Sequence, residues 1–331
     1  MAAKRKIGSF EVNPLGLGCM SLSAAYDAQP DEGESAKLLH RALDLGCDFL
    51  DTAAIYGNGH NETLVGRVLR ERRGEYVLAS KCGFRMTGAL PRVVDGSPGS
   101  IQTTLERSLA QLQVDHIDLY YLHRPDPVVP IEESVGTLAR AVEAGKIGAI
   151  GLSEVSADQL RRAHAVHPIA ALQTEYSLWT RNPEIAGLAA CRELGVTFVA
   201  FSPVGRGFLA GSCGQPDSSP ADPIRATMPR FRPPSVETNR ALFARFRQMA
   251  VEIGCTPAQL SLAWLLHRDP DLLTIPGTRS IAHMEENMAA DRVVLSAGQM
   301  AALDALFNPQ TVSGSRYGPA MQATVTTEEF A

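Results

Sequence analysis

Apolar and polar positions follow two alternating patterns along this chain. Short apolar runs rich in β-branched and aromatic residues are typical of buried strands, and eight of them occur, near residues 15, 48, 76, 117, 147, 169, 196 and 272. The segments between them carry apolar residues at helical spacing and predict helices over 33–45, 62–72, 100–112, 132–144, 156–166, 184–194, 256–267 and 280–290. Eight strand–helix pairs predict a closed (β/α)8 barrel, the TIM barrel, and near-continuous apolar strands suit a parallel sheet covered on both faces.

Two segments depart from an ideal barrel. Residues 6–13, "KIGSFEVN", predict a small N-terminal β-hairpin that closes the barrel floor. The segment after the seventh strand carries seven prolines between 203 and 234, so the long loop over 205–235 is predicted to be a lid or to be disordered. No second domain is indicated, and we predict a single domain over 1–331.

An open, doubly wound sheet is the alternative to the barrel. It usually needs fewer strands and carries a phosphate-binding glycine fingerprint after the first of them. Residues 16–21, "GLGCMS", lack the third glycine of that fingerprint, which favours the barrel.

Composition and charge narrow the function classes. The 331 residues are 45% hydrophobic and 20% charged, as in a soluble globular protein, and the formal net charge of −5 argues against nucleic acid as a main partner. No window approaches the roughly 18 uncharged apolar residues of a membrane span, and the basic residues 4–6 precede no apolar segment. We therefore predict no membrane association and a cytoplasmic location. The sequence does not indicate an oligomeric state.

The cysteines point to a reducing compartment. The six of them lie at 19, 47, 82, 191, 213 and 255, with no C-x-x-C pair and no histidine at metal-finger spacing from one. Free thiols in a reducing cytoplasm are the simplest interpretation, and no metal is predicted.

Ionisable residues end three successive predicted strands. Asp51 ends the second strand, Lys81 the third and His123 the fourth, while Tyr56 lies in the glycine-rich loop after Asp51. A lone strand-end lysine is usually a solvated charge, and a lone histidine is more often a structural residue. In a barrel, however, the carboxyl ends of all strands share one mouth, where the chemistry of such folds is found. The combination therefore predicts an active site.

The residue types suit acid catalysis at a carbonyl group. A free tyrosine has a pKa of about 10, and a buried ammonium nearby favours the phenolate and lowers that pKa. Lys81 is the candidate ammonium, Asp51 its partner, and His123 a hydrogen-bond donor to a bound carbonyl oxygen. This arrangement fits protonation of a carbonyl oxygen as hydride arrives at the carbon.

At these residues the chain resembles the aldo-keto reductase superfamily, from "LGLGCM" near the N-terminus to "IPGTRSIAHMEEN" near residue 280. "DTAAIYG" and the two following strand ends match the catalytic tetrad of that family, which implies the catalytic residues Asp51, Tyr56, Lys81 and His123. The motifs "GLSEV", "EYSLWTR" and "SPVGRGFL" are similar to those of the bacterial, yeast and plant branch. The resemblance implies NAD(P)H-dependent reduction of aldehydes or ketones, reversible as alcohol oxidation, without a metal.

The resemblance also implies a cofactor site. Ser153 and Gln173 are expected to bond the nicotinamide amide and Phe201 to stack on its ring, while Glu154 stands where many relatives have Asn and can only accept as a carboxylate. Arg279 is the one fixed cation in the adenosine segment, which implies NADP(H) as the preferred cofactor with NAD(H) also accepted. The full implied set is Met20, Asp51, Ser153, Gln173, Phe201, Ser202, Pro203, Gly205, Gly207, Gly277, Thr278, Arg279, His283, Glu286 and Asn287.

The expected substrate is a small-molecule carbonyl compound. Tyr26, Phe84 and Trp179, with Met20, give an apolar and aromatic pocket lining that favours hydrophobic or aromatic carbonyls over free sugars. Three other functions stay open on sequence alone. They are a binding protein on the same scaffold, as in the potassium-channel β subunits that resemble this family, a Schiff-base enzyme using Lys81, and a metal-dependent hydrolase, which the lack of clustered ligands disfavours.

Overall fold

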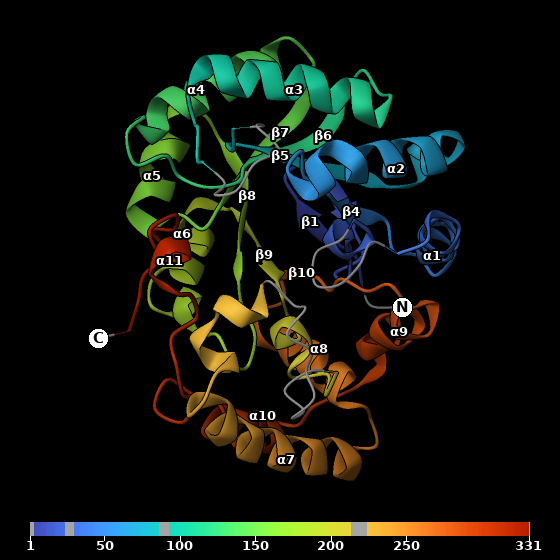
Figure 1. The fold of residues 1–331 in the computed structure, drawn as a ribbon, viewed down its shortest axis with the longest axis vertical. Helices are drawn as coiled ribbons and strands as arrows, with labels where there is room; N and C mark the ends of the chain where they lie inside the picture. Colours follow the sequence, from blue (N-terminus) through green and yellow to red (C-terminus); the bar gives the residue numbers. More distant parts are fainter. Residues whose placement is uncertain (1–2, 24–29, 86–92, 213–223, 331) are drawn as a thin grey trace.

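The computed structural model describes residues 3–23, 30–85, 93–212 and 224–330 and contains the predicted barrel. Its eight parallel strands follow chain order around the sheet (Figure 1). They are β3 (Leu17–Gly18), β4 (Phe49–Asp51), β5 (Val77–Cys82), β6 (Ile117–Leu122), β7 (Ile147–Ser153), β8 (Ile169–Glu175), β9 (Thr197–Phe201) and β10 (Leu273–Ile275). The first and last strands meet through Thr274, whose N–H donates to Pro14 O at 2.8 Å and whose carbonyl accepts from Gly16 N at 2.9 Å. The barrel prediction is therefore confirmed.

Helices surround the strands, as Figure 1 shows. The predicted ones are α1 (Glu32–Asp44), α2 (His60–Leu69), α3 (Pro98–Leu112), α4 (Ile131–Glu143), α5 (Ala157–Val166), α6 (Gly187–Leu194), α8 (Pro257–Arg268) and α9 (Ile281–Met288). The structure adds α7 (Ser235–Ile253), α10 (Ala297–Leu306) and the short α11 (Pro319–Gln322), none of which was assigned from sequence.

Helix α7 is the largest element that the sequence interpretation missed. Its apolar residues recur at helical spacing, Phe246 and Ala250 are fully buried, and Gly254 ends the helix with a φ of 84°. The helix begins directly after a proline-rich stretch, whose composition predicts a loop up to residue 235. The periodicity was sufficient to assign it.

The N-terminal hairpin closes the end of the barrel at which the strands begin. Strand β1 (Arg5–Ile7) pairs antiparallel with β2 (Phe10–Val12). Ile7 and Val12 are fully buried and belong to the core inside the barrel, with Phe49, Ala79, Leu119, Tyr121, Ala171, Val199, Leu273 and Ile275. Arg5 ties the hairpin down by donating to the carbonyls of Leu266 at 2.9 Å and Asp269 at 3.0 Å. With its floor filled, the barrel is open to chemistry only at its other end.

A second and larger core lies between the strands and the surrounding helices. In α3, for example, Ile101, Leu105, Leu109 and Leu112 face inward at helical spacing and are buried. Burying each such side chain contributes roughly 1.5–3 kcal/mol. Two shells of apolar contacts thus fix the strand ends that carry the polar residues.

The connection from β9 to α7 spans residues 202–234 and is long, as predicted. Its described parts form three short 3-10 turns, η5 (Gly205–Gly207), η6 (Arg225–Thr227) and η7 (Pro229–Phe231). Residues 213–223 lie outside the described residues, and with them the middle of the predicted lid.

No single helix of the described chain is long and apolar enough to cross a membrane. Helices α7 and α8 reach the necessary length and composition only together, and they bend by 82° at the break between them.

Candidate active site

The carboxyl ends of β4 and β5 bring a lysine, an aspartate and a tyrosine into one hydrogen-bonded group. Lys81 forms an ion pair with Asp51, and both side chains are buried. The Lys81 ammonium also donates to Thr52 O at 2.8 Å and reaches the Tyr56 hydroxyl at 3.4 Å. All three hydrogens of the ammonium therefore have an acceptor, and one acceptor is the phenol.

The loop after β4 is built so that Tyr56 turns back toward the strand end. Tyr56 opens the 3-10 turn η2 (Tyr56–Gly59), in which Gly57, Asn58 and Gly59 have φ angles of 56°, 53° and 94°. Three successive residues in this region favour glycine and asparagine, which explains the "GNG" sequence. An added Cβ on Gly59 would lie 2.1 Å from the Gln111 amide, the flexible end of a side chain that would have to move, so the positive φ is the stricter reason for glycine there.

Asn61 fixes the same loop through side-chain hydrogen bonds. It is fully buried, its oxygen accepts from Thr52 Oγ1 at 2.6 Å, and its amide nitrogen donates to Cys19 O at 2.9 Å and Ser23 Oγ at 2.8 Å. Asn61 therefore ties the loops after β3 and β4 together directly behind Tyr56. Sequence reasoning missed this residue, although its place at the start of α2 was visible.

His123 follows β6 and completes the predicted group. Its ring meets the ring of Tyr56 edge to face at a centroid distance of 5.8 Å, and that of Phe84 at 5.2 Å. His123 and Phe84 are both buried. Four residues from three strand ends thus lie together, as their spacing in the sequence suggested.

The charges of this group depend on burial and on each other. Burial acts most strongly on Lys81 and would lower its pKa, but the fields of Asp51 and Tyr56 outweigh it, so the pKa of Lys81 lies above its ordinary value. Burial also raises the pKa of Tyr56, and Lys81 is the strongest influence that lowers it. The net pKa of Tyr56 is therefore raised, contrary to the lowering expected from the sequence, because depth of burial cannot be read from strand-end spacing.

Ser153 and Gln173 lie in the same row of the β7–β8 ladder. Gln173 Nε2 donates to Asp51 Oδ2 at 2.7 Å, across the barrel between strands four places apart in the sheet. Ser153 Oγ accepts from Arg124 at 3.3 Å. Both side chains are buried at the same end as Lys81. The amide expected to contact the cofactor is thus also a partner of the aspartate.

The other residues implied for the cofactor follow β3, β9 and β10. Phe201 ends β9, and the turn after it has positive φ angles at Ser202, Gly205 and Gly207 of 51°, 57° and 91°. Pro203 is buried in this segment, and Met20 is partly buried in η1 (Cys19–Leu22). After β10 come Gly277, Thr278, Arg279, His283, Glu286 and Asn287, of which Gly277, Arg279 and His283 are exposed.

Only part of the expected substrate lining is brought together. Phe84 contacts His123, as described above. Trp179 is buried, and its ring packs on Phe208 at 4.0 Å and on Phe231 at 5.6 Å, within the connection that follows β9. No ring contact joins Trp179 to Phe84 among the described residues, and Tyr26 lies outside them.

Glu154 is the residue that the structure explains and the sequence did not. It is fully buried with a φ of 59°, and its carboxylate accepts from Arg316 at 3.2 and 2.5 Å, from Thr327 Oγ1 at 2.8 Å and from Glu175 N at 3.0 Å. Its carbonyl accepts from Thr326 N at 2.9 Å. Glu154 thus fastens the C-terminal segment beside Ser153 and presents no open acceptor to a cofactor.

A second buried pair holds the turn after β9. Arg206 donates to Glu175 at 2.6 Å and to the Tyr317 hydroxyl at 3.0 Å. Glu175 ends β8, and Tyr317 belongs to the same C-terminal segment as Arg316. These pairs join residues separated by up to 162 positions, and no local pattern in the sequence announces them.

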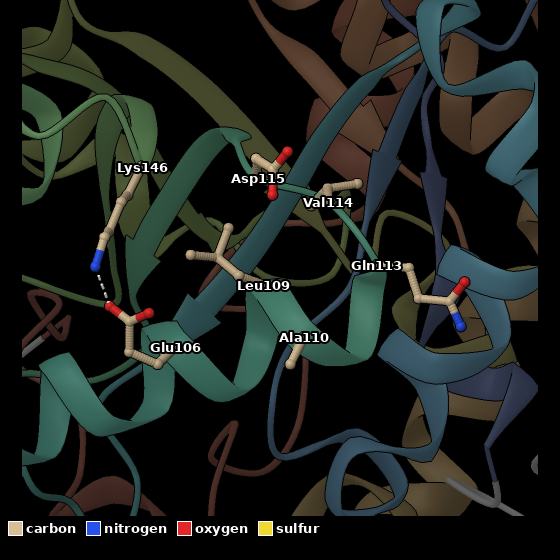
Figure 2. Close-up of a pocket in the computed structure, with 7 residues that line it drawn as sticks. All are labelled: Glu106, Leu109, Ala110, Gln113, Val114, Asp115 and Lys146. Atoms are coloured by element: carbon tan, nitrogen blue, oxygen red, sulfur yellow. Dashed lines mark hydrogen bonds and ion pairs between the residues drawn. The ribbon is translucent and has the colours of Figure 1, made fainter.

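The cavity shown in Figure 2 lies away from these residues. It has a volume of about 440 Å³ and is lined by Glu106, Leu109, Ala110, Gln113, Val114, Asp115 and Lys146. Asp115 and Lys146 directly precede β6 and β7, so the cavity lies at the end where the strands begin, opposite Lys81. An ion pair between Glu106 and Lys146 crosses it. This cavity therefore does not mark the active site, and a smaller void touches Lys81, Phe84 and His123.

Within the residues that the structure describes, no three His, Cys, Asp or Glu side chains gather in a group able to hold a metal ion.

Comparisons with known proteins agree with the fold. The sequence model of the aldo/keto reductase family matches residues 14–308. A probable aldo-keto reductase of Glycine max is 41% identical over 315 residues, which cover 94% of this chain and 91% of that protein. The structure of a glycerol dehydrogenase from Gluconobacter oxydans is similar with a TM-score of 0.83 and 27% identity, over 92% of this chain and 95% of that one. A holo aldo-keto reductase from Bacillus halodurans has a TM-score of 0.77 and 27% identity, over 93% and 97%.

Proposed function

The chain belongs to the aldo/keto reductase family and is an oxidoreductase, and we propose that it reduces aldehydes or ketones with NADPH and catalyses the reverse oxidation of alcohols. The observation that carries the proposal is the bonded group of Asp51, Lys81 and Tyr56 at the barrel mouth. Tyr56 is the general acid in reduction and the general base in oxidation, with His123 beside it.

The proton moves from the Tyr56 hydroxyl to the carbonyl oxygen. As the proton leaves, negative charge develops on the phenol, and the Lys81 ammonium 3.4 Å away stabilises it. Asp51 keeps Lys81 charged and in place, and Gln173 in turn orients Asp51. Burial alone raises the pKa of Tyr56, so the opposing influence of Lys81 keeps the phenol acidic enough to act.

His123 orients the substrate in this proposal. Its ring lies across that of Tyr56, so an oxygen bound between them can accept hydrogen bonds from both. The Phe84 ring, which meets that of His123 edge to face, limits access of water. A carbonyl oxygen held in this way is polarised before the proton is transferred.

The residues at the ends of β7 to β10 suit a nicotinamide dinucleotide by their chemistry. Ser153 and Gln173 offer a hydroxyl and an amide in one row, and Phe201 offers an aromatic face. The positive-φ turn at Gly205 and Gly207 suits close approach of a pyrophosphate to the backbone. When bound, the cofactor supplies the hydride that the protein's own side chains cannot supply.

A preference for NADPH over NADH is the finer part of the proposal. Arg279 and His283 are exposed at the start of α9, next to the buried Thr278, where a helix N-terminus favours an anion. A fixed guanidinium there suits the additional phosphate of NADPH.

The experiment is turnover of a panel of carbonyl compounds with NADPH and with NADH, followed by the loss of reduced-cofactor absorbance. We expect reduction of at least one aldehyde class with NADPH and slower turnover with NADH. Absence of turnover across aliphatic and aromatic aldehydes and ketones with both cofactors would contradict the proposal.

A Schiff-base mechanism is disfavoured by the contacts of Lys81. A nucleophilic lysine must be a free amine. Lys81 is an ammonium with a raised pKa that is held by Asp51, Thr52 O and Tyr56. Borohydride trapping with a carbonyl substrate should therefore leave Lys81 unmodified in mass spectra.

A further inference from the structure

Arg124 directly follows His123 and is the least compensated buried charge at the barrel mouth. Only 8% of the residue is exposed. Its Nη1 donates to His123 O at 2.7 Å and to Ser153 Oγ at 3.3 Å, and both acceptors are neutral. It forms no ion pair with any residue that the structure describes, and its Nε is buried without a hydrogen-bond partner.

The other buried arginines of the described chain form ion pairs, although the Nε of Arg316, like that of Arg124, has no hydrogen-bond partner there. Arg181 is 7% exposed and pairs with Glu184 at 2.6 Å and Asp304 at 2.9 Å. Arg316 is 3% exposed and pairs with Glu154 at 2.5 Å. A buried charge without a counter-ion costs several kcal/mol, which is why buried arginines are normally paired. Arg124 is therefore an exception within its own molecule.

The unused donors of Arg124 form one edge of the guanidinium. Nη1 is engaged, whereas Nε and Nη2, which point in the same direction from the planar group, have no acceptor among the described residues. Two parallel N–H groups of this kind match the two oxygens of a carboxylate. The charge is also close to the reacting group, because it lowers the pKa of Tyr56, though less than Lys81 does.

We propose that Arg124 binds the carboxylate of the substrate, so that this enzyme favours carbonyl compounds that carry a carboxylate over neutral ones of the same shape. The proposal rests on the proposed reductase function and adds a substrate class to it. It also changes the expectation from sequence, because it adds a cation, bonded to His123 O and Ser153 Oγ, to a lining that was expected to be apolar and aromatic.

A carboxylate suits this position better than a phosphate. One guanidinium edge neutralises one negative charge, whereas a phosphate group carries more charge and usually gathers several donors. Lys81, the other cation of the mouth, is already neutralised by Asp51. The pyrophosphate of the cofactor is expected at the turn after β9, on a different strand end.

The test compares para-formylbenzoate with its methyl ester and succinic semialdehyde with its methyl ester. The two pairs differ in length and rigidity, and within a pair only the charge changes. We expect kcat/KM to be about ten-fold to a hundred-fold higher for each acid than for its ester, the range for a hydrogen bond to a charged group. The difference should lie mainly in KM, because the carboxylate is bound before and during the reaction.

The decisive variants are Arg124→Gln and a matched control. Arg124→Gln keeps hydrogen-bond donors but removes the charge, and should bring the acid-to-ester ratio close to one. Arg124→Lys should keep part of the ratio, because the charge remains without the bidentate edge. The control is Arg85→Gln, which removes the same charge from an exposed arginine that follows β5 and pairs with Asp95 at 3.3 Å. It should leave the ratio unchanged.

Three results would overturn the proposal: a ratio near one in the wild type, a ratio that persists in Arg124→Gln, or an equal fall in Arg85→Gln. If Arg124 only orients Ser153 or the cofactor, acid and ester lose activity equally and the ratio persists. Circular dichroism verifies folding, and Arg124→Lys decides the question if the glutamine variant does not fold.

Calorimetric titration of para-formylbenzoate and its ester into the cofactor-loaded enzyme separates this inference from the proposed function. A chain that turns over neither these compounds nor any other member of the carbonyl panel contradicts the reductase proposal, whereas tighter binding of the acid that is lost in Arg124→Gln would still support Arg124 as the carboxylate site. Equal binding of acid and ester would overturn it independently of turnover.

Discussion

Two buried ion pairs lie at the mouth of this barrel, and they differ in what surrounds them. Asp51 and Lys81 join β4 to β5, and Glu154 and Arg316 join the end of β7 to the C-terminal segment. Both pairs are almost fully buried. Each oxygen of Glu154 is occupied by donors of the protein, whereas Lys81 extends one hydrogen to a phenol at the longer distance of 3.4 Å.

The difference indicates two uses of the same interaction. Buried ion pairs are tolerated when hydrogen bonds satisfy their remaining atoms, and removing one partner is then strongly destabilising. The carboxylate of Glu154 meets this condition within the protein, although the Nε of Arg316 has no partner among the described residues, and the pair fixes the position of a chain segment. In the Asp51 pair Lys81 donates to the Tyr56 oxygen, which leaves the phenolic proton available to a substrate oxygen. The first pair is expected to stabilise the fold and the second to act in catalysis.

The largest expected effect tests the catalytic side of this comparison. Tyr56→Phe removes the proton donor and leaves the Asp51–Lys81 pair intact. Carbonyl reduction should fall by roughly 10²–10⁴, the range for a positioned general acid. Cofactor affinity, measured by fluorescence titration, should hardly change. Turnover of a good aldehyde within about three-fold of the wild type would contradict the proposed role of Tyr56, since a surface tyrosine in a turn would give that result.

Lys81→Met extends the same test. Lys81 is the strongest influence that lowers the pKa of Tyr56. Without it, burial raises that pKa further, so turnover should again fall severely. The double variant should lose little more than either single one, because both act through one proton transfer. Additive losses would show that the two residues act separately.

The second effect tests the structural side. Glu154→Gln leaves Arg316 buried without a counter-ion, and should lower the free energy of unfolding by about 3–5 kcal/mol. The double variant Glu154→Gln with Arg316→Met removes both charges and should recover part of that loss. Urea unfolding followed by circular dichroism measures both.

Turnover of the folded Glu154→Gln variant is the matched readout. It should stay far above that of Tyr56→Phe, because protein donors already occupy both carboxylate oxygens of Glu154. An unchanged unfolding midpoint, or a loss of turnover as large as that of Tyr56→Phe, would remove the distinction between the two pairs.

These contrasts also show what the sequence could predict. The eight strands and their carboxyl ends depend on local patterns of apolar residues, and the active-site group repeats a family motif, so both were accessible. Arg316 and Glu154 are 162 positions apart, and the segment around Arg316 has no periodicity that would place it beside β7. The raised pKa of Tyr56 depends on burial, which exists only once the loops have packed. Helix α7 was missed because the prolines before it predict a loop, although the apolar residues of the helix recur at helical spacing.

The third effect concerns a cation outside both pairs. Arg279 is exposed just before α9. Arg279→Ala should weaken NADPH binding about ten-fold to a hundred-fold, the range for a hydrogen bond to a charged group, and leave NADH binding nearly unchanged. Fluorescence titration with both cofactors measures this, and equal losses would show that Arg279 does not recognise the additional phosphate.

The smallest effect concerns a buried carboxyl that has no cation bonded to it in the described structure. Glu62 on α2 is fully buried and accepts from Ser80 Oγ at 2.6 Å. Burial raises its pKa from 4.5 to about 7, so the folded protein holds a proton that the unfolded chain releases at lower pH. This group therefore contributes stability that is fully present below the ordinary pKa and is lost as pH rises through about 7.

Glu62→Gln should remove this pH dependence, because the amide keeps a neutral polar group in the same place. From roughly pH 5 to pH 8, the free energy of unfolding of the variant should rise by about 1–2 kcal/mol relative to that of the wild type. Urea unfolding at the two pH values measures this. The buried carboxylate of Glu175 predicts the opposite sign, because the attraction of Arg206 and neighbouring cations outweighs burial and lowers its pKa. A wild type that becomes more stable than Glu62→Gln as pH rises would therefore show that Glu62 is ionised in the fold, and that it too has found a cation.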